Sequence, residues 1–337
     1  MNDKAFLIIT SIAPPDNKVL NVFASECLAH NTGFIVIGDT KSPKEFKLAN
    51  CDFYSIDRQS ELAFKLARSL PVRKYSRKNL GYLLAMKQGA EIIIETDDDN
   101  FPADGFWDER ARNVQAYPLS GKGWVNIYRF FTQDNVWPRG FALEHLNDPR
   151  AAIDTAIRSV YCPIQQGLSD GDPDVDAIFK LTSEMPVKFD RFGNIALVLN
   201  TWCPFNSQNT TWFREAFPLL YLPSHCSFRM TDIWRGFVAQ RVAWTNDWSV
   251  LFHKATVFQE RNEHDYLVDF KDEVPGYLNN GKICNELQKI DLEPGPEHIF
   301  ENILKCYDVF ISHQLISPDE LPILNDWIDD CSQLLRK

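Results

Sequence analysis

Short hydrophobic runs alternate with amphipathic stretches through the first hundred residues of the chain. Hydrophobic runs bounded by turn residues occur at residues 4–12, 33–39, 51–56 and 91–95. Runs of this length are typical of strands that are buried on both faces. Hydrophobic residues at helical spacing lie between these runs, at residues 16–30, 60–70 and 76–90. This alternation predicts βα units around a mostly parallel sheet.

After residue 100 the pattern becomes irregular and rich in aromatic residues. We expect strands in three hydrophobic segments, at residues 124–131, 194–205 and 248–252. Residues 165–179 read "QQGLSDGDPDVDAIF" and predict a loop, because Asp, Gly, Ser and Pro are typical of turns.

The last part of the chain has helical spacing, with Pro296 and Pro318 as helix-start signals. The sequence therefore predicts two units. Residues 1–272 form an α/β domain with a mostly parallel central sheet flanked by helices, and residues 273–337 form a short C-terminal helical extension.

Composition narrows the class of protein. With 337 residues, 45% of them hydrophobic, the chain can bury a large core. The formal net charge of −11 argues against binding to nucleic acid or an anionic membrane surface, because both repel an acidic protein. No hydrophobic run approaches the ~20 residues that a bilayer-spanning helix needs, and no signal peptide is evident. Eight cysteines without a C-x-x-C pair favour reduced thiols, so we expect a soluble cytoplasmic protein.

The most unusual feature is "EIIIETDDDN" at residues 91–100, a buried-strand pattern that ends in three aspartates. Adjacent like charges repel one another, so this clustering favours a cationic ligand. On an extended chain alternate residues point to the same side, which predicts that Asp97 and Asp99 share a side and Asp98 points away. Mg²⁺ and Mn²⁺ take oxygen ligands and often use only one or two protein carboxylates. The sequence therefore predicts a divalent-cation site, with a solvated acidic turn as the alternative.

A basic segment, "RSLPVRKYSRK" at residues 68–78, contrasts with the acidic composition of the chain. Ser76 is a candidate N-cap, which would place Arg77 and Lys78 in the first turn of a helix. Cations there oppose the helix dipole, but beside free backbone N–H groups they form a site for a phosphate. We therefore expect a diphosphate site, with a solvated basic face as the alternative.

Three predicted strands end at residues with ligand-binding chemistry. The first ends at Thr10 and Ser11, the second at Gly38 and Asp39, and the strand of residues 91–95 ends at the aspartates. In parallel sheets ligands bind at the carboxyl ends of the strands. All three strand ends should therefore line one site.

Several segments resemble the STELLO-type glycosyltransferases, which are distantly related to the reversibly glycosylated polypeptides of plants. The main segment is "SRKNLGYLLAMKQGAEIIIETDDDN", and further matches are "VIGDTKSP", "QQGLSDGDPDVDAIFKL", "PFNSQNT" and "DIWRGFVAQR". Together they extend from near Thr10 to about Asp272, roughly four fifths of the chain. We expect no membrane anchor of the kind typical of the plant Golgi members, so their location is not transferred.

The resemblance implies a GT-A-like (Rossmann-like) fold, a divalent metal (Mn²⁺ or Mg²⁺), and a nucleotide-sugar donor linked to UDP or GDP. The sugar would pass to a glycan or another hydroxyl acceptor. The expected nucleotide-sugar-binding residues are Thr10, Ser11, Gly38, Asp39, Arg77, Lys78, Asp97 and Asp98. Asp97 and Asp99 would hold the ribose and the metal, with Asp99 as the direct ligand.

Further candidates lie later in the chain. The spacing of the aspartates around Asp172 and Asp174 does not fit an EF-hand. These two residues are candidates for contact with sugar or acceptor hydroxyls, because carboxylates accept hydrogen bonds from hydroxyl groups; an acidic turn is the alternative. Asp232 is the candidate base that deprotonates the acceptor hydroxyl, with ordinary N-capping as the alternative. Arg235 would pair with Asp232 or with a phosphate. His253 is the candidate third metal ligand.

Other functions remain open on the sequence. A nucleotide-sugar mutase or a self-glycosylating protein would need no external acceptor. A haloacid-dehalogenase-type phosphatase also uses D-x-D after a strand, but carries it on the first strand. A non-catalytic partner that binds a nucleotide sugar is the last alternative.

Overall fold

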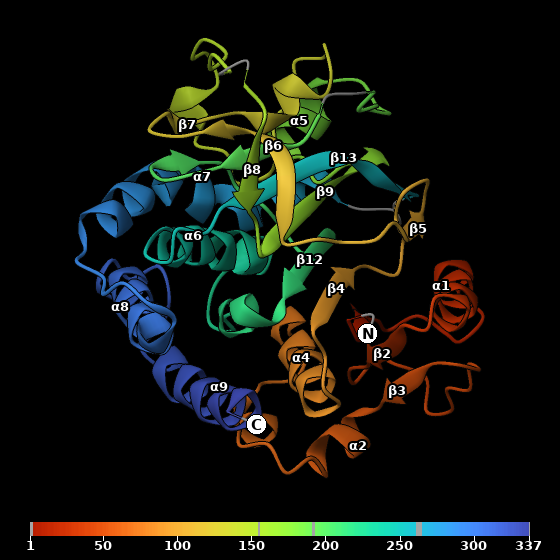
Figure 1. The fold of residues 1–337 in the computed structure, drawn as a ribbon. Coiled ribbons are helices and arrows are strands. Elements are labelled where there is room, and N and C mark those ends of the chain that lie inside the picture. The colour runs from red at the N-terminus through yellow and green to blue at the C-terminus, as the bar shows by residue number, and fades with distance from the viewer. Residues whose placement is uncertain (1–2, 154–155, 191–192, 261–264, 337) are drawn as a thin grey trace.

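The structure is a computed structural model that describes residues 3–153, 156–190, 193–260 and 265–336. Within these residues an eleven-stranded sheet forms the centre, and helices flank it (Figure 1). This arrangement confirms the predicted α/β fold class.

One half of the sheet consists of four parallel strands. They lie side by side in the order β3 (Asp52–Tyr54), β2 (Gly33–Ile37), β1 (Ala5–Thr10) and β4 (Ile92–Thr96). Because they are parallel, their carboxyl ends meet at one edge of the sheet.

The other half of the sheet is mixed. It continues from β4 in the order β12 (Asn209–Phe213), β9 (Ile164–Gly171), β13 (Val250–Gln259), β10 (Ile195–Leu197), β6 (Asn113–Leu119) and β8 (Arg158–Tyr161). The β9–β13 and β10–β6 pairs are parallel, and the remaining pairs are antiparallel. The short strand β5 (Asn100–Pro102) pairs with the end of β13, and β7 (Gly123–Trp124) pairs with β11 (Thr201–Trp202) in a separate sheet.

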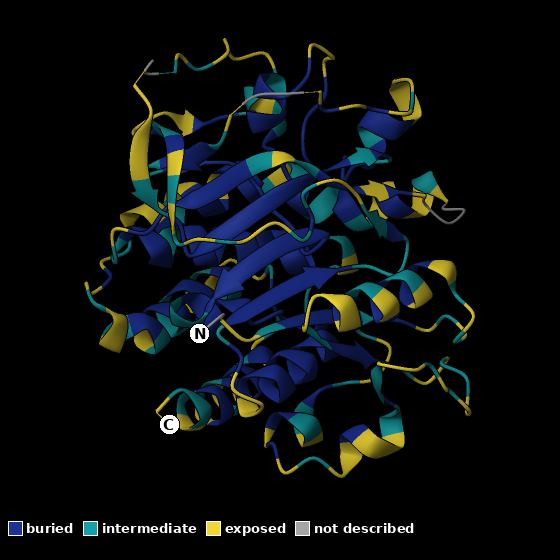
Figure 2. Cartoon of the chain, turned by 45° about the vertical axis from the view of Figure 1, so that its right-hand side comes forward, coloured by how far each residue is buried: buried dark blue, intermediate teal, exposed yellow. Residues whose placement is uncertain are grey.

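The central parallel strands are buried on both faces because alternate residues enter two separate cores. Ile8 and Ile93 pack in one core with helix α4 (Lys78–Lys87), whereas Leu7 and Ile94 pack in the other with α1 (Lys18–Ala29). Figure 2 shows these strands in the dark blue of buried residues. A strand covered on both faces requires a continuous hydrophobic run, which is why the sequence predicts these strands.

The segment that leads into α4 differs from the prediction. Residues 60–70 do not form one helix; two short helices, α2 (Ile56–Ser60) and α3 (Leu66–Ser69), lie in this region instead. A 3₁₀ turn at Tyr75–Arg77 precedes α4, and Ser76 is not an N-cap, because its Oγ hydrogen-bonds with Ser224 Oγ at 2.7 Å. The capping prediction was therefore wrong.

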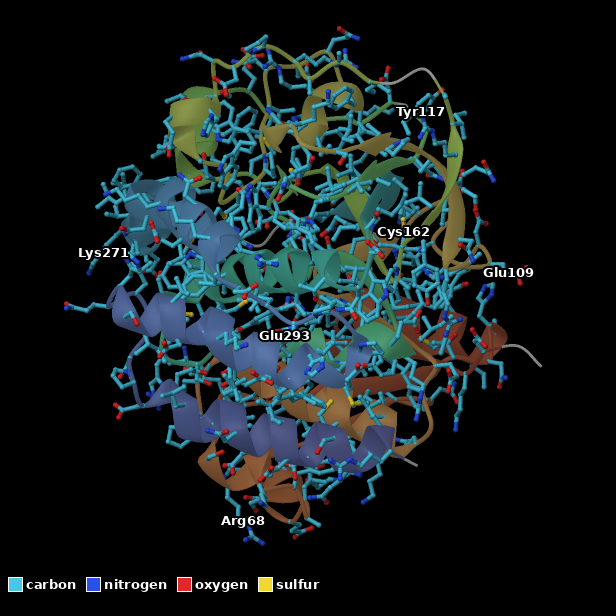
Figure 3. The ribbon with its side chains drawn as sticks, turned by 60° about the vertical axis from the view of Figure 1, so that its left-hand side comes forward. Arg68, Glu109, Tyr117, Cys162, Lys271 and Glu293 are labelled. Carbon is cyan, nitrogen blue, oxygen red and sulfur yellow. The ribbon has the colours of Figure 1, made fainter. Side chains whose placement is uncertain are left out.

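The C-terminal helices form a layer along one side of the molecule (Figures 1 and 3). They are α7 (Tyr266–Lys289), α8 (Ile299–Ser312) and α9 (Glu320–Leu335), and they pack with α6 (Thr231–Trp244) and α4. Figure 3 views this side and shows Lys271 of α7 and Arg68 of α3 at the exposed surface. The expected boundary after residue 272 falls inside α7, and the division into two units stays a prediction.

Two buried carboxylates fix α9 to the α/β domain. Glu320 accepts hydrogen bonds from the backbone N–H groups of Ser224 and His225, at 2.9 Å and 2.7 Å. Asp330 accepts from the backbone N–H groups of Lys65 and Leu66 at 3.1 Å and 2.9 Å, where α3 begins. The helical extension is therefore attached to the domain by charge-assisted hydrogen bonds as well as by hydrophobic packing.

Several predicted elements in the middle of the chain were wrong. Residues 124–131 form a two-residue strand and a 3₁₀ turn (Ile127–Phe130), not a long strand. The segment expected to be a loop contains the buried strand β9, a turn and the helix α5 (Ala177–Thr182). Strand β12 was not predicted. Both missed strands contain buried polar side chains, so their burial is not visible as hydrophobicity.

The described residues include no helix that is long and hydrophobic enough to cross a membrane. All eight cysteines are free, and most of them, such as Cys162 in Figure 3, are buried.

Candidate functional site

A pocket of about 620 Å³ lies at the edge of the sheet where β1, β2 and β4 end. Of the residues predicted for the site, it is lined by Thr10, Ser11, Gly38, Asp39, Arg77, Asp97, Asp98, Asp99, Asp174 and Asp232. The structure thus brings together residues from segments up to about 220 positions apart (10 to 232). This is the geometry expected when parallel strands end at one edge.

The three aspartates all face the pocket, which corrects the predicted alternation. The chain turns at Asp98 and Asp99 and is not extended there, so Asp98 does not point away. Asp97 Oδ1 accepts a hydrogen bond from the Tyr75 hydroxyl at 2.9 Å and lies 3.5 Å from Lys78 Nζ. Burial raises the pKa of Asp97, and Lys78 opposes this effect.

Asp98 and Asp99 are also held by neighbouring side chains. Asp98 accepts a hydrogen bond from the Ser11 hydroxyl, and burial raises the pKa of its carboxyl group. Asp99 Oδ2 accepts a hydrogen bond from Gln259 Nε2 at 3.0 Å, which links it to the end of β13. A hydroxyl and an amide thus orient these two carboxylates.

The chemistry of the aspartates fits a hard divalent cation, because carboxylate oxygens are the ligands that Mg²⁺ and Mn²⁺ prefer. In the described part of the chain, however, no three His, Cys, Asp or Glu side chains are arranged to hold a metal ion. A cation at Asp97 or Asp99 would thus take most of its ligands from water and a bound substrate. His253 does not line the pocket; it lies on β13 with Nδ1 3.0 Å from the Lys254 carbonyl oxygen, and burial lowers its pKa to about 4.

Another part of the pocket wall carries positive charge. Arg73, Lys74 and Lys41 line it together with Arg77. Arg77 donates from Nε to Gln59 Oε1 at 2.7 Å and from Nη1 to the Leu70 carbonyl at 3.0 Å, so it is held firmly by the protein. Burial lowers its pKa. Lys78 is fully buried beneath the pocket and donates to the Thr96 carbonyl oxygen, so its predicted phosphate contact is replaced by support of the aspartate turn.

Asp39, at the end of β2, is oriented by two backbone groups. Its Oδ1 accepts from the Thr40 N–H at 2.6 Å, and its Oδ2 accepts from the Arg73 N–H at 2.7 Å. The carboxylate therefore has a fixed direction within the pocket and ties the end of β2 to the basic segment.

A buried arginine that the sequence did not indicate organises the third wall. Arg139 Nε and Nη2 lie 2.7 Å from the two carboxylate oxygens of Asp174, and Nη2 lies 3.0 Å and 2.9 Å from those of Asp232. Asp174 also accepts from Asn206 Nδ2 at 2.8 Å. One guanidinium thus holds two carboxylates that come from distant parts of the chain.

The environment of Asp232 determines what its carboxylate can do. Burial alone would raise its pKa, but Arg139 outweighs burial, and the pKa of Asp232 is lowered. A carboxylate with a lowered pKa is a weak proton acceptor. Asp232 lies in the first turn of α6 and is better suited to accept a hydrogen bond than to remove a proton.

Two other predicted residues lie outside the pocket. Asp172 forms an ion pair with Lys180. Arg235 is fully buried, with Nη1 2.8 Å from Glu95 Oε1, and it lies over the ring of Trp212. In this geometry Arg235 neutralises the buried carboxylate of Glu95 on β4.

These observations define an α/β protein with a ligand pocket at the carboxyl edge of its parallel strands, walled by acidic and basic residues. Residues 229–336 match the family model of the STELLO glycosyltransferases. The chain is also 29% identical over 316 residues to "Probable glycosyltransferase STELLO2" and 28% identical to "Probable glycosyltransferase STELLO1", both of Arabidopsis thaliana. The chain is therefore similar to the STELLO glycosyltransferases, and the expected resemblance is confirmed.

The alignments cover a larger share of this chain than of the STELLO proteins. Each alignment covers 88% of this chain, but only 41% of STELLO2 and 40% of STELLO1, so the chain spans about two fifths of the relatives' length. Among solved structures, "Crystal Structure of a Mycobacterial Protein" aligns with 82% of this chain and 74% of its own, at 10% identity and a TM-score of 0.44. That likeness is too low to support any argument.

Proposed function

We propose that this protein is a metal-dependent glycosyltransferase that moves a sugar from a UDP- or GDP-linked donor to an acceptor hydroxyl. The observation that carries the proposal is the pocket itself: three aspartates and a basic wall line the same cavity of about 620 Å³. A nucleoside diphosphate sugar has a phosphate pair for such a wall and needs a cation to offset its charge. The kinship with the STELLO glycosyltransferases supports the same function.

In this proposal the strand ends bind the nucleoside. Thr10, Ser11, Gly38 and Asp39 line the part of the pocket formed by β1 and β2. The fixed Asp39 carboxylate accepts hydrogen bonds from base or ribose, and the basic segment that it holds through the Arg73 N–H meets the diphosphate. Arg77, held by Gln59 and Leu70, contributes positive charge without having to be ordered on binding.

Asp97 and Asp99 would hold the ribose and the metal, with Asp99 as the closer ligand. A bound divalent cation would neutralise the charge that develops on the leaving diphosphate. The residues of the chain supply the rest: Tyr75 and Lys78 fix Asp97, and Gln259 fixes Asp99. Their contacts keep the aspartates in place before the donor arrives, which reduces the cost of binding.

The acceptor would meet the wall formed by Arg139, Asp174 and Asp232. We propose that these carboxylates accept hydrogen bonds from the acceptor and align its reacting hydroxyl. Phe228, which lines the pocket with 55% of its surface exposed, offers a flat apolar face at the same rim.

The test measures melting temperature with UDP- and GDP-sugars, each with Mn²⁺ and with EDTA. A ligand that binds only the folded protein raises the melting temperature by mass action. We expect a metal-dependent increase with one nucleotide class. Asp99→Asn should abolish this increase, whereas Asp104→Asn, a change at an exposed aspartate outside the pocket, should retain it. No increase with any donor in a folded protein would refute the proposal.

The reaction type is tested separately by mass spectrometry of the protein after incubation with the binding donor. A transferase with an external acceptor should gain no mass. A covalent sugar on the chain would favour the self-glycosylating alternative.

A further inference from the structure

Two hydroxyl groups connect Asp97 to Asp232 across the pocket. The Tyr75 hydroxyl oxygen lies 2.9 Å from Asp97 Oδ1 and 2.6 Å from Ser207 Oγ. Ser207 Oγ in turn lies 3.2 Å from Asp232 Oδ2. All four residues line the pocket, so the chain of contacts runs along its wall. Under the proposed function, on which this inference rests, Asp97 serves the donor and Asp232 the acceptor.

The two hydroxyls cannot satisfy all three contacts at once. Each hydroxyl has one proton to donate, so two protons are available for three hydrogen bonds. Lys78 Nζ lies 3.5 Å from Asp97 and Arg139 Nη2 lies 2.9 Å from Asp232, so each carboxylate has a cation beside it, and a carboxylate paired with a cation in its ionised form donates no proton. If each hydroxyl donated to its own carboxylate, the two hydroxyl oxygens would lie 2.6 Å apart with no proton between them and would repel each other. A proton placed between these oxygens leaves one of the two carboxylates without its hydroxyl donor.

Two arrangements use both protons and place one of them between the two hydroxyl oxygens. In the first, Ser207 donates to Tyr75, and Tyr75 donates to Asp97. In the second, Tyr75 donates to Ser207, and Ser207 donates to Asp232. The Tyr75 oxygen accepts from Lys78 Nζ at 2.7 Å in both, so the lysine does not choose between them. The arrangements differ only in the rotation of two O–H bonds, and no atom enters or leaves.

We propose that Tyr75 and Ser207 are positioning residues that form a two-hydroxyl switch between the donor and acceptor ends of the pocket. A ligand group that binds Asp97 displaces the hydrogen bond from the Tyr75 hydroxyl. The O–H bonds of Tyr75 and Ser207 then both rotate toward Asp232. A hydroxyl bound at Asp232 turns them back toward Asp97. Each ligand thus strengthens the hydrogen bond that the other must displace. Because coupling is reciprocal, each weakens the binding of the other by about fivefold, the effect of one hydrogen bond.

The test is a double-mutant cycle with UDP·Mn²⁺ and GDP·Mn²⁺ as probes, measured by titration calorimetry on the full chain. Asp232→Asn makes residue 232 a poorer acceptor, so the switch should stay turned toward Asp97 and oppose the probe. The variant also loses a negative charge, which affects cation binding regardless of the switch. In the Tyr75→Phe background only this charge effect should remain. The loss of affinity caused by Asp232→Asn should therefore be about fivefold larger with the native tyrosine than in the Tyr75→Phe background.

Asp174→Asn is the matched control. This substitution also removes a carboxylate that is paired with Arg139. In the native protein Asp174 Oδ2 contacts Arg139 and Asn206 rather than the hydroxyls of Tyr75 and Ser207. Its effect on probe affinity should be equal in the two backgrounds. A background-dependent effect at residue 174 as large as that at residue 232 would overturn the switch, because it would show a general disturbance of the pocket.

Two further outcomes are decisive. An equal effect of Asp232→Asn with the native tyrosine and in the Tyr75→Phe background would overturn the switch while leaving the proposed function intact. If Asp232→Asn does not fold, Ser207→Ala takes its place. Ser207→Ala should weaken probe binding about fivefold with the native tyrosine and leave probe binding unchanged in the Tyr75→Phe background. Equal effects in the two backgrounds would again overturn the switch. If the unmodified protein binds neither probe, the proposed function fails, and this inference fails with it.

Discussion

Replacing Arg139 by methionine tests the buried charge cluster in the pocket wall. Methionine is unbranched and close to arginine in length, so the main change is the loss of the guanidinium. Only 5% of Arg139 is exposed, and its carboxylate partners Asp174 and Asp232 are 7% and 6% exposed. The substitution leaves two buried carboxylates close together without the cation that they share.

The expected cost follows from this burial. Removing one partner of a buried ion pair costs about 3–5 kcal/mol. An unfolding entropy of about 2.1 cal/mol/K per residue gives about 0.7 kcal/mol/K for 337 residues. The melting temperature should therefore fall by about 4–7 °C at pH 7. Arg58→Met is the control: its pair with Asp52 is exposed on both sides, so its loss should cost less than about 1 kcal/mol.

The pH dependence separates lost charge from lost packing. In the native protein Arg139 holds the pKa of Asp232 below its ordinary value, so this group adds stability above its unfolded pKa, and the stability is lost as pH falls through the folded pKa. Without Arg139, burial raises the pKa of Asp232 in the folded protein. The Asp232 carboxylate then destabilises the fold at pH values above its unfolded-state pKa. The difference in melting temperature should be largest at pH 7 and smaller near pH 4.5, where the penalty from the raised pKa in the variant has declined while the native contribution of Asp232 is still present. Equal differences at both pH values, measured by differential scanning fluorimetry, would refute the reasoning.

Two other substitutions test how helices are joined to the sheet. Gly81→Ala places a Cβ 2.5 Å from Ile8 Cγ2, so α4 must move away from β1, and urea denaturation should show a loss of about 1–3 kcal/mol; an unchanged midpoint would contradict the close approach. Asp330→Asn weakens the acceptor for the N–H groups at the start of α3 and should cost about 1 kcal/mol. Hydrogen exchange at Leu66 should accelerate more than exchange in β1, and uniform acceleration would argue against a local role.

The parallel half of the sheet was predictable because its strands lie between two cores. Ile8 and Ile93 face one core while Leu7 and Ile94 face the other, so neither face needs a polar residue. The result is a continuous hydrophobic run, and the strand ends then locate the aspartates at the pocket.

The mixed half was not predictable on the same basis. Strands β9 and β12 carry Gln166 and Thr210, which are buried but hydrogen-bonded to the Asn206 backbone: Gln166 Oε1 accepts from its N–H at 2.9 Å, and Thr210 Oγ1 donates to its carbonyl oxygen at 2.6 Å. In the sequence, a strand with buried polar residues of this kind resembles a loop, because the groups that hydrogen-bond these residues are known only from the structure. The turn at Asp98 was missed for a related reason, since the hydroxyl that holds it belongs to Ser11, beyond the end of another strand.

Arg139 shows the same limit at the candidate site. It stands alone in "WPRGF", and its partners lie 35 and 93 positions away. Nothing local distinguishes it from a surface arginine. The sequence could indicate which strand ends line the pocket, but not the buried cation that holds Asp174 and Asp232 in the third wall.

The position of β12 in the sheet has a consequence for synthesis on the ribosome. β12 covers the edge of β4, yet Trp212 and its partner Glu95 are 117 residues apart. At about 5–20 residues per second, roughly 6–23 s of translation separate the two. During that interval the isoleucine-rich edge of β4 has no permanent neighbour, and an open hydrophobic edge is a template for aggregation. The nascent chain should therefore depend on chaperone protection until residue 213 has emerged.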